Sequence, residues 1–238
     1  MSQIETRNIP TREAINPDIL WSKYSVIQHI IFWILALAAW KALYWAGGKY
    51  EHLTLQIWHY LTRFRFYFFT GNPQQTLLVG LITGIVVLGI ILGLDYLIAK
   101  IKGDPPIRHI LRNHSLLPRT GKQQFFAFIV SVNAGIFEEL FFRGGIFTLI
   151  LLLTHSTVSA VLFTSALFAV LHEPIQGWYS TLLIFFVGIT LNLLMLITGD
   201  FYSAMACHIV INLGNLFLIP ALFEDDLEKF LLEDALEN

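Results

Sequence analysis

The sequence is poor in charge and almost free of cysteine. Charged residues make up 13% of its 238 residues, whereas they make up about 25% of an average soluble domain. The single cysteine, Cys207, excludes a disulfide within the chain and any metal site built from several cysteines. The one basic segment, residues 100–122, is short and typical of a cytoplasmic loop. The composition therefore argues against a soluble domain and gives no support to a nucleic-acid partner.

Long apolar runs stand where charge is missing. Hydrophobic residues make up 55% of the sequence, and several runs approach or exceed the ~20 residues with which a helix crosses a bilayer. Backbone groups in lipid must be satisfied within a segment or in a closed barrel, and these runs are too long for barrel strands. The sequence thus predicts an all-α, polytopic transmembrane helical bundle of about six to eight spans, embedded in a lipid bilayer.

The chain divides into a polar leader (residues 1–24), a transmembrane domain (25–222) and an acidic tail (223–238). Residues 55–69 carry apolar side chains at helical spacing, which predicts one interfacial amphipathic helix, with a short span as the alternative. The positive-inside rule makes the basic segment cytoplasmic and places both termini in the cytoplasm. The expected spans are residues 25–46, 77–99, 122–153, 156–172, 178–198 and 201–220.

Two of the expected spans should depart from a straight helix. Residues 122–153 would reach ~45 Å as one helix, against a hydrocarbon core of ~30 Å. We therefore expect a break there, at Gly144-Gly145. Pro174 is expected to end the helix that precedes it.

Three ionisable residues interrupt the longest apolar run. Glu138, Glu139 and Arg143 are surrounded by apolar sequence, and each costs a few kcal/mol at hydrocarbon depth. Glu139 and Arg143 are four residues apart and share a helix face, so they can neutralise each other. Glu138 adds a second negative charge, which such a pair does not explain. The segment therefore predicts a functional site.

Two histidines and an asparagine lie in the later apolar segments. His172 ends one run, while His208 and Asn212 are four apart on one face of the last span. A carboxylate in an apolar site can act as a general base on water, and imidazole and amide groups can donate to an oxyanion. The set therefore suits hydrolysis. Glu138, His172 and His208 can equally form a zinc shell with an open fourth position, and the residues alone leave both mechanisms open.

Other hydrolytic signatures are missing from the sequence. It has no His-Glu-x-x-His zincin motif, no Gly-x-Ser-x-Gly elbow and no Ser/Lys dyad. A serine nucleophile is therefore not expected, and the polar residues of the apolar segments must carry the chemistry.

The polar residues fall into three motifs that resemble those of a known family. The motifs are Glu138-Glu139-x-x-x-Arg143, Phe168-x-x-x-His172 and His208-x-x-x-Asn212, on successive apolar segments. The same motifs in the same order mark the CAAX-prenyl-endopeptidase and bacteriocin-processing (CPBP, Abi-type) intramembrane proteases. The resemblance covers residues 123–218, the motif-bearing core of what would then be a catalytic domain over 25–222. We expect such a multi-pass protein in a bacterial or archaeal cytoplasmic membrane.

The resemblance implies a role for each matching residue. Glu138 would activate the attacking water, His172 would help to position it, and His208 with Asn212 would form the oxyanion side. The other two charged residues of the first motif, Glu139 and Arg143, would support them. A metal-free, glutamate-based mechanism is favoured over a zinc metalloprotease, so no cofactor is expected. If zinc is bound, its ligands would be Glu138, His172 and His208.

We therefore expect an intramembrane endopeptidase that cleaves a membrane-associated peptide or a membrane-anchored protein tail. The alternatives are a non-catalytic immunity or scaffold membrane protein of the same fold, and a proton-coupled transporter. With straight helices, His172 and His208 would lie near opposite membrane faces. They can meet only in a bent or tilted bundle, and Pro174 and Gly177 are the expected seat of the irregularity.

Overall fold

The computed structural model describes residues 72–102 and 117–223, and positions 20, 22–23, 25–27, 29–31 and 33–34. Every regular element of this part of the chain is a helix, which confirms the all-α prediction. Three described helical segments are long and apolar enough to cross a membrane: Pro73–Ile101, Ser180–Thr198 and Tyr202–Leu222. The predicted interfacial helix over 55–69, the acidic tail beyond Phe223 and the side chains of 173–179 lie outside the described residues.

One continuous helical segment carries the first motif. It consists of α6 (Gly121–Glu139), the π-helix η2 (Leu140–Phe147) and α7 (Thr148–Thr154). It begins at a capping box, in which Thr120 and Gln123 each bond to the other's backbone N–H. It ends at His155, whose left-handed backbone (φ 50°) stops the helix.

The predicted break at Gly144-Gly145 is wrong, because the helix continues through both glycines as η2. In a π-helix the backbone N–H bonds to the fifth residue before it, so the turn widens but its polar groups remain paired. Backbone in lipid requires such pairing. The irregularity expected at this point therefore takes the form of a wide turn rather than an interruption.

The helix α8 (Thr157–Thr198) folds back on itself. A straight helix of 42 residues would be ~63 Å long. Instead, the amide nitrogen Nδ2 of Asn192 lies 3.4 Å from the carbonyl oxygen of Val161. A Cβ placed on Gly188 would lie 3.1 Å from the Cα atom of Ser165. Both pairs are centred between residues 176 and 177, so the two halves of α8 run antiparallel.

The prediction that a helix ends at Pro174 is therefore wrong, although the chain does reverse direction around this residue. The backbone is helical from Thr157 to Thr198, across both Pro174 and Gly177. Proline removes one helical hydrogen bond and favours a bend. The sequence required a bent bundle if His172 is to meet the other site residues, and in the structure His172 Nε2 lies 3.7 Å from Glu138 Oε2.

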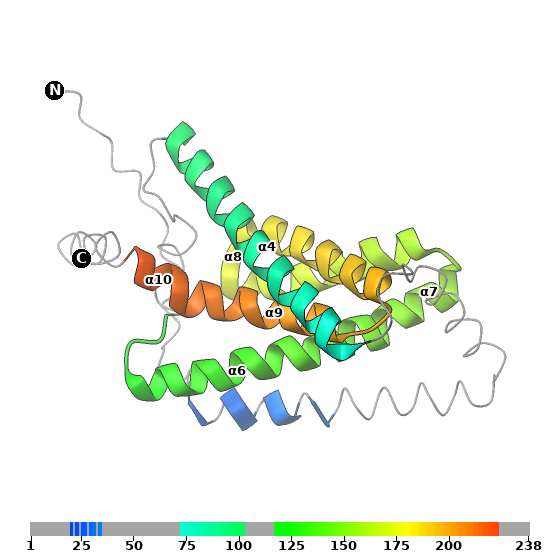
Figure 1. The fold of residues 1–238 in the computed structure, drawn as a ribbon, viewed down its shortest axis with the longest axis horizontal. Helices are drawn as coiled ribbons and strands as arrows, with labels where there is room; N and C mark the ends of the chain where they lie inside the picture. The colour runs from blue at the N-terminus through cyan, green and yellow to red at the C-terminus, as the bar shows by residue number, and fades with distance from the viewer. Residues whose placement is uncertain are drawn as a thin grey trace.

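The last span lies in the middle of the bundle and is made of α9 (Tyr202–Leu213), η3 (Gly214–Leu218) and α10 (Ile219–Leu222). Figure 1 shows α9 between α4 (Pro73–Lys102) and α6. Glycines allow both α4 and α6 to approach α9 closely. A Cβ on Gly80 of α4 would collide with the carbonyl of Ser203, and a Cβ on Gly135 of α6 would collide with Ile209. Small residues at such crossings let helices approach in lipid.

The outer surfaces of the helices are apolar. Large hydrophobic side chains point outward from α4, α7 and both halves of α8, including Ile85, Leu153, Phe163 and Phe186. A soluble protein rarely exposes so much contiguous apolar surface, whereas lipid accommodates it. Together with the three spans, this surface identifies the chain as an integral membrane protein.

Candidate active site

The first half of the site is a fully buried ion-paired group, here called the buried layer: Glu139, Arg143 and His208. Glu139 Oε1 accepts hydrogen bonds from Arg143 Nη1 at 3.0 Å and from His208 Nδ1 at 2.7 Å. The side chains of Glu139 and Arg143 are completely buried, and that of His208 is nearly so. Charges at this depth must be paired to be tolerated, and these are paired by short, charge-assisted bonds.

Arg143 has two further partners besides Glu139. Its Nη2 donates to the backbone carbonyl of Gly188 at 3.1 Å, and its guanidinium carbon lies 4.8 Å from the centre of the Phe168 ring. Arginine combines such planar stacking with directed hydrogen bonds better than lysine does. The guanidinium is therefore fixed by a carboxylate, a carbonyl and an aromatic face, which in turn fixes Glu139.

The second half of the site is the open layer: Glu138 and His172. Their side chains are 20% and 22% exposed, while the Glu138 Oε2 atom itself is buried and has no hydrogen-bond partner among the described residues. Glu138 Oε2 lies 3.7 Å from His172 Nε2 and 3.9 Å from His208 Nε2. These separations exceed a direct hydrogen bond, so Glu138 is close to both imidazoles without being bonded to either.

Adjacent positions on the helix explain how neighbouring glutamates enter different layers. Successive residues of an α-helix project about 100° apart, so Glu138 and Glu139 cannot face the same way. Glu139 is the last residue of α6, and Arg143 lies in the wide turn of η2. Their spacing keeps them on one face toward the interior, while Glu138 faces the histidine at the end of the first half of α8.

The hydrogen bonds of both histidines assign their ring protons. His172 Nδ1 lies 2.7 Å from the carbonyl oxygen of Phe168, and His208 Nδ1 lies 2.7 Å from the Glu139 carboxylate. Both partners can only accept, so both Nδ1 atoms carry hydrogen. Each Nε2 then faces Glu138 with a lone pair when its ring is neutral. Glu138 Oε2 and His172 Nε2 are then two neighbouring acceptors, which suits a bound water that donates one hydrogen bond to each.

Phe168 organises the centre of the site. Its buried ring packs against the rings of His172, His208 and Phe142 at centroid distances of 4.6, 5.6 and 5.0 Å. Its carbonyl orients His172, as described above. The sequence indicates Phe168 as a motif position but predicts no role for it. Its place four residues before His172 was the signal that the two residues lie together on one helix face. The contribution of the Gly188 carbonyl has no such signal, because any residue supplies a carbonyl.

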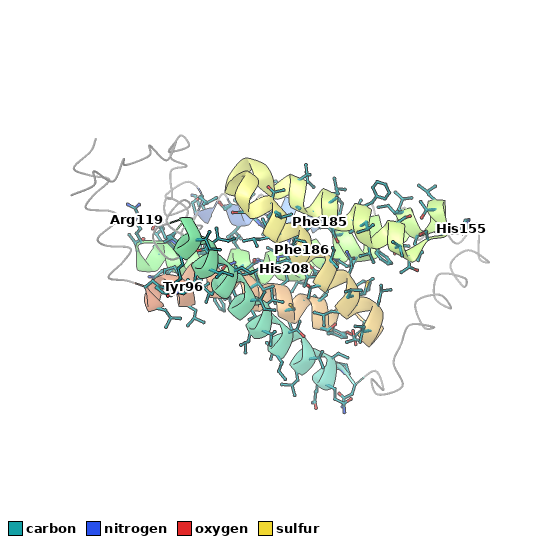
Figure 2. All side chains as sticks on the ribbon, turned by 90° about the horizontal axis from the view of Figure 1, so that it is seen from above. Tyr96, Arg119, His155, Phe185, Phe186 and His208 are labelled. Carbon is teal, nitrogen blue, oxygen red and sulfur yellow. The ribbon has the colours of Figure 1, made fainter. Side chains whose placement is uncertain are left out.

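Asn212 lies beside the two layers rather than within them. It is one helical turn beyond His208 on α9, and its Nδ2 donates to the carbonyl of Ser131 on α6 at 3.5 Å, a long hydrogen bond. The structure therefore brings Glu138, Glu139, Arg143, His172 and His208 together. Figure 2 shows His208 near the centre of the helices.

The zinc ligands expected from the sequence are Glu138, His172 and His208, and Glu138 Oε2 lies 3.7 and 3.9 Å from the Nε2 atoms of the two histidines. Zinc holds nitrogen and oxygen ligands at ~2.0–2.2 Å. Among the residues that the structure describes, no three His, Cys, Asp or Glu side chains are grouped so as to hold a metal ion. The steps proposed below are written with protein groups and water.

Comparison with known proteins identifies the part of the chain that contains the site. Residues 120–214 match the family model described as type II CAAX prenyl endopeptidase Rce1-like. This match includes all three motifs and agrees with the family that they resemble. The searches of curated proteins and of solved structures each gave no match.

Proposed function

We propose that this chain, whose residues 120–214 match the type II CAAX prenyl endopeptidase Rce1-like family model, is a CAAX-type membrane protease that cleaves its substrate through a glutamate-activated water. The substrate would be a peptide or protein tail held at the membrane. The observation that supports this proposal best is the position of Glu138. Its Oε2 lies within 4 Å of both imidazole Nε2 atoms, in a side chain that is one-fifth exposed.

The first step is attack by water. A water between Glu138 and His172 donates one hydrogen bond to each, which directs an oxygen lone pair toward the scissile carbonyl. As the new C–O bond forms, the water's proton passes to the Glu138 carboxylate. The carbonyl's π electrons move to its oxygen, giving a tetrahedral oxyanion.

The second step needs a donor to that oxyanion. His208 Nδ1 already donates to Glu139, so its Nε2 can donate only when the ring is protonated. The second N–H of Asn212 provides a further donor from the same helix face. Collapse breaks the C–N bond, and the proton on Glu138 passes to the leaving amine.

The test is cleavage by Glu138→Gln in proteoliposomes. The substrates would be membrane-anchored peptides with prenylated and unprenylated tails, analysed by mass spectrometry. We expect the wild type to cut at one defined bond in at least one tail, and Glu138→Gln to accumulate no product. Cleavage at the wild-type rate by the variant would refute the catalytic assignment. Absence of cleavage by the wild type in every tail would refute the proposed substrate class.

A further inference from the structure

A second buried polar group lies behind the site, in the second half of α8. The Asn192 side chain is completely buried, and its Nδ2 lies 3.0 Å from Ser165 Oγ, 3.0 Å from the Gly188 carbonyl and 3.4 Å from the Val161 carbonyl. An amide nitrogen has two hydrogens, so the two shorter contacts account for them. Placing an asparagine in an apolar span costs free energy, so such a residue is a candidate for a functional role.

The Gly188 carbonyl joins this group to the catalytic residues. It accepts from Asn192 Nδ2 at 3.0 Å and from Arg143 Nη2 at 3.1 Å. Arg143 in turn holds Glu139, whose Oε1 holds His208. A continuous series of polar contacts thus runs from Asn192 to the imidazole that faces Glu138. The close approach of the α8 halves at Gly188, where a Cβ would crowd Ser165, places Asn192 within reach of both partners.

We propose that Asn192 is a positioning residue for the proteolytic reaction. By fixing the Gly188 carbonyl it sets the orientation of the Arg143 guanidinium, and through it that of the Glu139–His208 pair. This inference rests on the proposed function. None of the three motifs includes Asn192, and it touches no group that would contact the substrate.

Removing Asn192 should leave every neighbouring group paired. The Gly188 carbonyl would still accept from Arg143, and Ser165 Oγ would still donate to the Val161 carbonyl at 2.7 Å. Among the described residues, the Asn192 Oδ1 atom itself has no hydrogen-bond partner, so its loss removes an unpaired buried acceptor. An apolar replacement should therefore not lower the free energy of unfolding. If Asn192 only joined the two halves of α8, the replacement would lower it, so unfolding measurements distinguish the two roles.

The main experiment compares Asn192→Leu with Thr198→Val in proteoliposomes. Thr198 is also buried in α8, and its hydroxyl bonds to Ser203 Oγ and the Leu194 carbonyl, away from Arg143. For Asn192→Leu we expect kcat about tenfold lower, with KM and the thermal unfolding midpoint unchanged, as for loss of one directed hydrogen bond. Thr198→Val should keep its kcat. Asn192→Ala repeats the test without adding volume.

Equal kcat values in both Asn192 variants and Thr198→Val would overturn the proposal. So would a fall in kcat that is matched by a fall in unfolding temperature, because that pattern describes a structural tie. In an Arg143→Lys background, removal of Asn192 should cost little further activity, since coupled residues are not additive.

A readout without catalysis separates this inference from the proposed function. Selective ¹⁵N labelling of arginine should give a slowly exchanging guanidinium signal for Arg143, identified by its loss in Arg143→Lys. We expect Asn192→Leu to shift and broaden that signal, and Thr198→Val to leave it unchanged. If Glu138→Gln still cleaves while the signal responds, the mechanism fails but the positioning contact stands. An unaltered signal in Asn192→Leu refutes the positioning role.

Discussion

The two layers of the site use the same residue types under opposite conditions. In the buried layer, Glu139 is fully enclosed and holds two partners at 3.0 and 2.7 Å. In the open layer, Glu138 is one-fifth exposed and stands 3.7 and 3.9 Å from its nearest nitrogens. The difference agrees with the proposed mechanism, in which one carboxylate is bonded into the protein and its neighbour keeps its lone pairs for water. A site that must bind a water precisely requires both.

The largest effect should come from exchanging the two glutamates' carboxylates for amides one at a time. Glu138→Gln should lower kcat about 10³-fold, because the general base is lost, and should leave the thermal unfolding midpoint unchanged. Glu139→Gln should lower activity and unfolding temperature together, since it weakens a buried ion pair. Parallel cleavage and thermal unfolding assays in detergent measure both. The same pattern in both variants would mean that the layers do not differ.

Removing the charge of Arg143, the partner of Glu139 in the buried layer, should mainly lower the stability of the fold. Arg143→Met leaves Glu139 buried without its strongest partner and should cost about 3–5 kcal/mol in unfolding free energy. The double variant Arg143→Met/Glu139→Gln should be more stable than Arg143→Met alone, because the uncompensated charge is gone. Unfolding midpoints of the three proteins test this. A double variant as unstable as the sum of the single losses would contradict it.

A backbone contact next to the site offers a subtler test. A Cβ on Gly135 would collide with Ile209 Cγ1 and would lie 3.0 Å from the Ile209 backbone nitrogen. Gly135→Ala should therefore push α6 away from α9 and separate Glu139 from His208. We expect a loss of about 1–3 kcal/mol in stability, with lower kcat. Gly145→Ala is the matched control, since nothing lies within 4 Å of its Cβ. Equal behaviour of the two variants would show that this helix contact does not support the buried layer.

The smallest effect is expected from chelators. If the open layer works through water alone, dialysis against a zinc chelator should leave kcat unchanged, and purified protein should carry no stoichiometric metal by elemental analysis. Loss of activity on chelation, restored by zinc, would mean that Glu138 and His172 are fixed by a metal. The open layer would then be as rigid as the buried one.

Sequence reasoning reached the composition of the site but not its arrangement. The Glu139–Arg143 pair follows from their spacing of four on a helix, and the family match covers all three motifs. The sequence did not predict the wide turn through Gly144-Gly145 or the continuous helix through Pro174. Glycine and proline ordinarily interrupt a helix. Contacts such as Arg143 with the Gly188 carbonyl depend on a tertiary reversal and on a backbone atom common to every residue.

The folding back of α8 also determines how the chain can be threaded through the bilayer. Because its two halves run antiparallel, Ala160 and Leu196 belong to one apolar cluster, and Thr157 and Thr198 emerge at the same side. The number of crossings that α8 contributes is therefore even. A topology reporter attached at His155 must give the same answer as one at Asp200, whichever compartment that is. The sidedness of α7 thus fixes that of the start of α9.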